Sequence, residues 1–96
     1  MVLMEIIKYL GDKLAKEINI SPPAARGLLK LSIKDQLDPF RPLFKITFNE
    51  LRDVLQHSFK KRLIKLEISN YEAIVDYMIK ELELNQSLIT MAGVYL

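Results

Sequence analysis

The residue most suited to acid–base chemistry is the single histidine, His57, which lies one helical turn after Asp53 and one turn before Lys61. A carboxylate at that spacing can orient an imidazole as a general base. The same spacing also forms the solvent-exposed pairs that are common on helix surfaces. No nucleophile is placed to work with His57. The sequence therefore favours an exposed pair over a catalytic one.

Other patterns typical of enzymes and cofactor sites are missing from the sequence. The chain has no cysteine, which removes thiol nucleophiles and thiolate metal ligands. Its three glycines, Gly11, Gly27 and Gly93, stand alone, so no glycine-rich phosphate loop is present. The sequence therefore predicts no enzyme activity, no metal, no cofactor and no small-molecule substrate.

Charge is divided unevenly along the chain. Residues 41–65 carry seven basic and two acidic residues, a formal charge of +5. Residues 66–96 carry one basic and five acidic residues, a formal charge of −4. Neighbouring helices would neutralise these charges at the surface. Alternatively, a basic strip of Lys60, Lys61 and Lys65 contacts phosphates, or basic and acidic faces meet across an interface. The sequence leaves these three interpretations open.

Arg62 and Ile64 contradict the pattern of the helix predicted around them. With 100° of turn per residue, Arg62 falls inside the apolar arc and Ile64 on the polar side. We expect Arg62 either to extend its head past the last turn into water, or to bind a carboxylate such as Glu67 or one on a partner chain. Two such residues on one turn indicate that the helix ends early or that another subunit covers it.

Three junctions of an isoleucine with a serine or threonine mark helix starts, because serine and threonine are favoured N-cap residues. They are Ile20–Ser21, Ile46–Thr47 and Ile68–Ser69. Thr47 and Ser69 each precede a glutamate by three residues, the spacing of a capping box. Ser21 is followed by Pro22, whose fixed φ suits the first helical position.

These starts and the spacing of apolar residues predict an all-α fold. The expected helices are at about 2–18, 22–37, 48–66 and 70–92, making a compact four-helix domain, or a five-helix one if the last helix breaks at Asn85. Phe40, Leu43 and Phe44, in the connector, are available to fill the core.

Two segments, 44–48 and 64–68, alternate apolar and polar residues. This is the period of a strand, so a short two-stranded element is the alternative for these residues.

Length and composition agree with one domain. Ninety-six residues, half of them hydrophobic, are enough for one core and too few for two. Glu5, Lys8, Asp12 and Lys13 interrupt the N-terminal apolar runs, so neither a signal sequence nor a membrane-spanning helix is expected there. We therefore expect a cytoplasmic protein, with which the absence of cysteine agrees.

Apolar residues outnumber the inward positions of a four-helix core. Those without an inward position are Leu31, Ile64, Val94, Tyr95 and Leu96. Exposed apolar surface usually marks an interface, and symmetric dimers are the commonest solution. The sequence therefore predicts a small helical adaptor or regulatory module that binds protein and self-associates, with Arg62, Ile64, Val94, Tyr95 and Leu96 as its interaction residues.

The alternative function is nucleic-acid binding by a helix-turn-helix variant. Residues 47–51 resemble the opening of the first helix of that motif, and the basic strip would lie against the backbone.

Overall fold

A computed structural model describes residues 2–37, 40 and 46–85, and there the chain is helical apart from its connections. The helices are α1 (Val2–Ile18), α2 (Pro22–Gln36), α3 (Phe48–Val54), α4 (Lys60–Lys65) and α5 (Tyr71–Leu84), with a π-helical segment, η2 (Leu55–Phe59), joining α3 to α4. The predicted all-α fold with one core is confirmed. Its boundaries differ from those expected by one or two residues, except at the end of α5.

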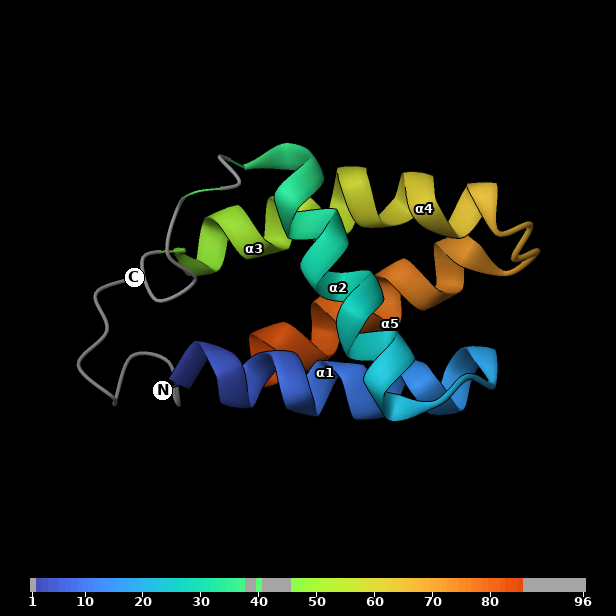
Figure 1. The fold of residues 1–96 in the computed structure, drawn as a ribbon, viewed down its shortest axis with the longest axis horizontal. Coiled ribbons are helices and arrows are strands. Elements are labelled where there is room, and N and C mark those ends of the chain that lie inside the picture. Colours follow the sequence, from blue (N-terminus) through green and yellow to red (C-terminus); the bar gives the residue numbers. More distant parts are fainter. Residues whose placement is uncertain (1, 38–39, 41–45, 86–96) are drawn as a thin grey trace.

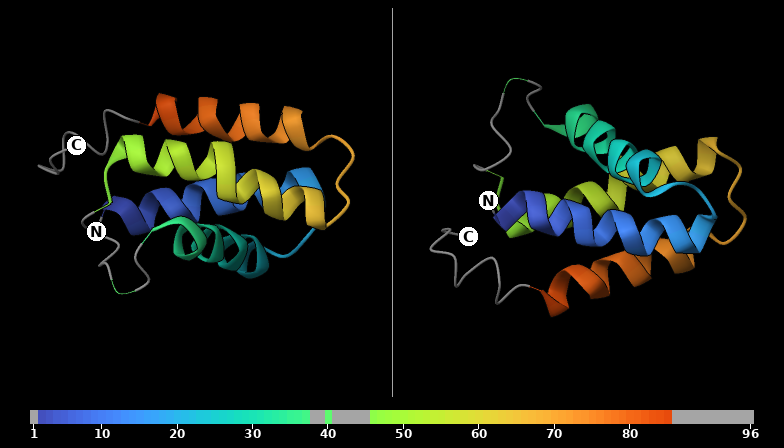
Figure 2. Two further views of the ribbon diagram at one scale, coloured as in Figure 1. Left: turned by 90° about the horizontal axis from the view of Figure 1, so that it is seen from above. Right: turned by 60° about the horizontal axis from the view of Figure 1, so that its bottom comes forward.

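The helices surround one core from four sides. In Figure 1, α1 lies below and the α3–η2–α4 stretch above, while α2 crosses in front and α5 passes behind. Seen from above, α5 runs alongside α3–η2–α4, and α2 lies on the other side (Figure 2). The largest fully buried side chains are Ile6, Ile7, Leu10, Leu14, Leu29, Leu51, Leu55, Phe59, Leu63, Ile74, Met78 and Leu82.

The connection between α1 and α2 follows the predicted signals. The Ala24 N–H donates to Ser21 Oγ at 3.3 Å, which makes Ser21 the N-cap of α2. Just before it, Asn19 has a φ of 56°, and the Ile20 N–H donates to the Ala15 carbonyl at 3.1 Å. This bond closes α1 with a left-handed residue, a position that asparagine tolerates.

The start of α3 has the predicted capping box. The Glu50 N–H donates to Thr47 Oγ1 at 3.1 Å, and the Thr47 N–H donates to Glu50 Oε1 at 3.0 Å. Both bonds satisfy donors that a helix N-terminus leaves without an intrahelical partner. Ile46 is buried, which anchors the chain as it enters α3.

The π-helical segment explains how one long helix keeps a single apolar seam. Leu51, Leu55, Phe59 and Leu63 are all buried and are spaced four residues apart. In a regular α-helix this spacing drifts by about 40° at each step, and by about 120° over the three steps. The wider turn of η2 removes most of that drift, because its hydrogen bonds close over five residues instead of four.

The start of α5 corrects one prediction. The Ile74 N–H donates to the Asn70 carbonyl at 3.1 Å, so Asn70 is the N-cap, and its side chain makes no capping bond. The predicted capping box of Ser69 with Glu72 is therefore wrong by one residue. The physical reason is how α4 ends: Glu67 has a φ of 58°, and the Ile68 N–H donates to the Leu63 carbonyl at 3.2 Å. This Schellman-type closure commits Ile68 to the preceding helix.

Three further expectations are corrected or limited. The two-stranded element is wrong for its described residues, because 46–48 lead into α3 and 64–68 end α4 and turn. Phe40 does not fill the core, since it is 91% exposed on a turn after α2. α5 ends at Leu84, with Asn85 as its C-cap, where a break was expected. Leu43, Phe44 and residues 86–92 lie outside the described residues.

Candidate interaction surface

The outer side of α4 presents an isoleucine among lysines. Ile64 is 47% exposed, and Lys61 and Lys65 are exposed beside it. Residues three and four apart are neighbours on a helix surface, so Lys60 and Lys61 lie directly alongside Ile64. We call Lys60, Lys61 and Ile64 the α4 face. The predicted exposure of Ile64 is confirmed.

Lys60 leans toward α5. Its Nζ lies 5.8 Å from the centroid of the Tyr71 ring, within range of a cation–π interaction. The aromatic face thus attracts the Lys60 ammonium without neutralising it. Of the three lysines predicted as phosphate contacts, Lys61 and Lys65 are exposed, whereas Lys60 is half-buried.

Arg62 does not lie in the apolar arc, and its partner is Asp35 on α2. Its Nε and Nη2 donate to Asp35 Oδ2 and Oδ1 at 2.6 and 2.9 Å, a bidentate pair. Two expectations for Arg62 are therefore wrong: its head does not extend past the last turn into water, and it does not bind Glu67. The physical reason is η2, which turns Arg62 out of the seam and onto the flank that meets α2.

The pair between α2 and α4 shifts the titration of both groups. The hydrogen bond from Arg62 is the largest influence on Asp35, and it holds the pKa of that carboxyl below its usual value. The same hydrogen bond raises the pKa of Arg62. Because Arg62 is already neutralised by Asp35, it contributes little charge to a surface on α4.

The outer side of α5 carries the opposite charge. Glu72, Asp76 and Glu83 are exposed there, together with Lys80, the single basic residue of α5. The Tyr9 hydroxyl donates to Glu81 Oε1, which fixes the Glu81 flank of α5 against α1. At helical spacing, Glu72, Asp76 and Glu83 therefore lie on the outer side and on the opposite flank, the one nearer α4. We call Glu72, Asp76 and Glu83 the α5 face.

In the described part of the chain, no ion pair connects a lysine of the α4 face to a carboxylate of the α5 face. Among the residues that the structure describes, the ion pairs are Arg26–Asp12, His57–Asp53 and Arg62–Asp35. None of them links α4 to α5, although the two helices pack against each other. Direct neutralisation between neighbouring helices, one of the three interpretations of the charge pattern, is therefore not observed for these residues.

His57 forms the exposed pair that its spacing predicts. Its Nδ1 lies 3.0 Å from Asp53 Oδ1, and both side chains are more than half exposed. Asp53 Oδ2 also accepts from Gln36 Nε2 at 2.7 Å, while Gln36 Oε1 accepts from Ser58 Oγ at 2.8 Å. This chain of bonds ties the end of α2 to η2, and the Ser58 hydroxyl is engaged in it rather than directed at His57. The pairing of His57 with Asp53 is therefore explained by these structural contacts.

Some predicted interaction residues are placed and others are not. Leu31 is 47% exposed on α2, as expected for a residue without an inward position. Val94, Tyr95 and Leu96 lie outside the described residues. Leu66 is 56% exposed because α4 has already ended at Lys65. The alternating pattern of 64–68 and the positions of Arg62 and Ile64 on the helical wheel were the sequence signals that this helix stops there.

Residues 2–37, 40 and 46–85 contain neither a metal site nor a membrane-spanning helix. In that part of the chain no three acidic, histidine or cysteine residues gather as a metal site would require. Nor does any helix there have the length and apolar character needed to cross a membrane.

Comparison with protein-family models, with curated proteins and with solved structures finds no match for the chain. The α4 and α5 faces are therefore interpreted from their own geometry.

Proposed function

We propose that this protein is a small helical interaction module that associates with a second copy of itself. The observation that carries the proposal is Ile64, an isoleucine 47% exposed among lysines on α4. Ile64 does not contribute to the core, because buried residues such as Phe59 and Leu63 already fill the inward side of the same helical stretch. Leu66, two residues after Ile64, is 56% exposed, so apolar surface gathers at the end of α4, where a partner would cover it.

The energetic gain from Ile64 is useful but small. Burying a fully exposed aliphatic side chain stabilises by about 1.5–3 kcal/mol, so covering the exposed half of Ile64 contributes about 1 kcal/mol per protomer. In a symmetric dimer this contribution is made twice, since each surface occurs on both subunits. The remaining affinity must come from neighbouring contacts, for which the charged α4 and α5 faces are available.

The test is the mass of the protein in solution. Sedimentation equilibrium at micromolar concentrations should give about twice the 11.2 kDa of the chain. Ile64→Lys should weaken association by about tenfold or more, because it replaces the covered side chain by a charge. Leu31→Lys is the matched control, since Leu31 has the same 47% exposure but lies on α2, across the molecule from α5.

Three outcomes would reject the proposal. A monomer throughout the range would remove self-association, and equal effects of Ile64→Lys and Leu31→Lys would show that Ile64 is not the covered residue. Tight binding of duplex DNA at physiological salt, abolished by reversing Lys60, Lys61 and Lys65 to glutamate, would support the nucleic-acid alternative instead. We expect only weak, salt-sensitive DNA binding.

A cytoplasmic location and an adaptor or regulatory role stay predictions. They are supported by the charges that interrupt the N-terminal apolar runs and by the exposed surfaces on α4 and α5.

A further inference from the structure

We propose that the second copy binds through the shared surface of α4 and α5, with the α4 face of each protomer against the α5 face of the other. This inference rests on the proposed function and specifies the contacts. The two-fold axis would run parallel to α4 and α5, along the line between them. Such an axis exchanges the two helices across the interface and makes each lysine of one protomer face a carboxylate of its partner.

The charges of this surface are complementary to those of a second copy. Lys60 and Lys61 lie on one side of it, and Glu72 and Asp76 on the other, with no ion pair between them in the described chain. A surface that is basic on one half and acidic on the other repels a copy placed basic side to basic side. It attracts a copy turned so that the halves are exchanged.

The basic and acidic residues also occur at matching heights along the two helices. α4 and α5 are antiparallel neighbours joined by the short turn at 66–70 (Figures 1 and 2). Lys60 Nζ lies 5.8 Å from the Tyr71 ring, so α4, a helix of six residues, lies beside the first turns of α5. An axis parallel to the helices preserves these heights. Lys61 therefore comes opposite the first two turns of the partner's α5, where Glu72 and Asp76 are.

A stable interface also needs an apolar centre and a sufficient surface area. Ile64 lies between Lys60 and Lys61 around α4, and Ile79 is a partly buried residue of α5. A standard interface covers about 800 Å² on each partner. Ile64 and the lysines alone cannot supply that area, whereas the sides of two adjacent helices can. The interface must therefore include α5, which is what the exchanged arrangement provides.

The experiment uses two charge-reversed variants of the full chain. The first replaces Lys60 and Lys61 by glutamate, and the second replaces Glu72 and Asp76 by lysine. Each variant gives the reversed positions of one helix the same sign as the facing helix of its partner, so each should weaken its own dimer by about tenfold or more at low salt. Mixed together, the two should form a heterodimer about as tight as the wild-type dimer, because every exchanged contact is again between opposite charges.

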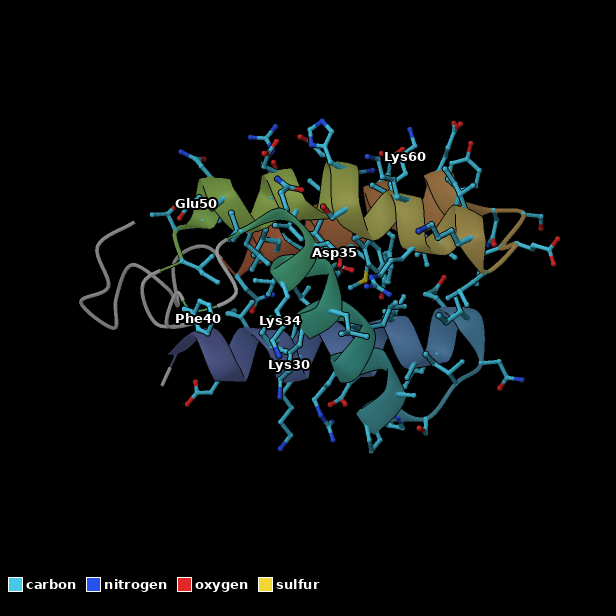
Figure 3. All side chains as sticks on the ribbon, turned by 45° about the horizontal axis from the view of Figure 1, so that its top comes forward. Lys30, Lys34, Asp35, Phe40, Glu50 and Lys60 are labelled. Atoms are coloured by element: carbon cyan, nitrogen blue, oxygen red, sulfur yellow. The ribbon has the colours of Figure 1, made fainter. Side chains whose placement is uncertain are left out.

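A matched control changes the same charge elsewhere. Lys30 and Lys34 lie on α2, on a different side of the molecule from Lys60 (Figure 3). Their double replacement by glutamate should leave the dimer unchanged. Circular dichroism and thermal unfolding of all three variants check that each is folded, so that weak association is not the result of unfolding.

The possible results separate this inference from the proposed function. A wild-type dimer that either double reversal leaves intact, or a mixture that fails to restore association, would overturn the exchanged arrangement while leaving self-association standing. A wild-type monomer would overturn both. A dimer weakened by each reversal and restored by mixing would support both.

Discussion

Gly11 and Gly27 both lie inside helices, yet the structure predicts that alanine has opposite effects at the two positions. Gly11 is buried in α1 where α2 crosses it, and Gly27 lies on α2. A Cβ built on Gly11 would lie 2.5 Å from Arg26 Cγ, 3.3 Å from Arg26 N and 3.4 Å from Arg26 Cα. A Cβ built on Gly27 meets no heavy atom within 4 Å.

The expected magnitudes follow from these distances. Replacing glycine by alanine inside a helix favours folding by about 1 kcal/mol. At Gly27 nothing opposes this gain, so unfolding should cost about 0.5–1 kcal/mol more. At Gly11 the new methyl group overlaps the stem of Arg26 by about 1 Å relative to ordinary contact. Such overpacking costs about 1–3 kcal/mol, so the net effect should be a loss of about 1 kcal/mol.

Relief of the clash at Gly11 is restricted. The Arg26 side chain cannot move freely, because its Nη1 lies 3.5 Å from Asp12 Oδ1 on α1. The Arg26 backbone is also at the limit of contact, so α1 and α2 must separate slightly. The overlap is therefore expected to persist as a measurable loss of stability.

Urea unfolding at one protein concentration, followed by circular dichroism, measures both variants. The midpoints should move in opposite directions, and the free energies of unfolding of the two variants should differ by about 2 kcal/mol, or about 10 °C in Tm. Equal stabilisation by both substitutions would refute the close crossing of α1 and α2 at Gly11.

Three further predictions concern the ends of helices and one ion pair. Thr47→Ala should lower the free energy of unfolding by about 1 kcal/mol, whereas Ser69→Ala should change it by only a few tenths, because only Thr47 caps a helix. Glu67→Gly should raise it by about 1 kcal/mol, since Glu67 holds a φ of 58°. Arg62→Gln should destabilise at neutral pH but not in acid. Arg62 lowers the folded-state pKa of Asp35, so the stabilisation is present above roughly pH 4 and is lost as the pH falls through that pKa.

Urea titrations check these predictions, repeated from neutral to acid pH for Arg62→Gln and wild type. A Ser69→Ala loss as large as that of Thr47→Ala would place the start of α5 one residue earlier. A destabilised Glu67→Gly would argue against the left-handed end of α4. A difference between Arg62→Gln and wild type that stays constant into strong acid would mean that Arg62 acts by packing rather than through the Asp35 carboxylate.

Local signals in the sequence were sufficient where the structure depends on neighbours along the chain. The N-cap of Thr47 and its capping box involve residues three apart, and the structure has both. α1 occupies the predicted range, because an apolar stripe repeating every three to four residues is itself a statement about a helix face. The exposure of Ile64 was likewise predictable, since a position on the polar side of a helix faces water when its apolar side packs on the core.

Contacts between residues far apart along the chain could not be predicted from the sequence. Arg62 meets Asp35, 27 residues away, and Tyr9 meets Glu81, 72 residues away. Each pairing depends on how helices cross, and many lysines, arginines and carboxylates had the right chemistry. The wheel that placed Arg62 among apolar residues assumed regular helix geometry. The four-residue spacing of the buried seam was the one clue to η2.

The sequence by itself thus determined the helices, the residues that cap α2 and α3, and the opposite signs of charge before and after residue 65, because these depend on composition and on local spacing. Only the tertiary structure decided which flank each charge occupies. The π-helical turn rotated Arg62 onto α2, and the bond between Tyr9 and Glu81 fixed the rotation of α5. A helix can turn about its axis without changing its sequence pattern, and packing against its neighbours is what selects one rotation.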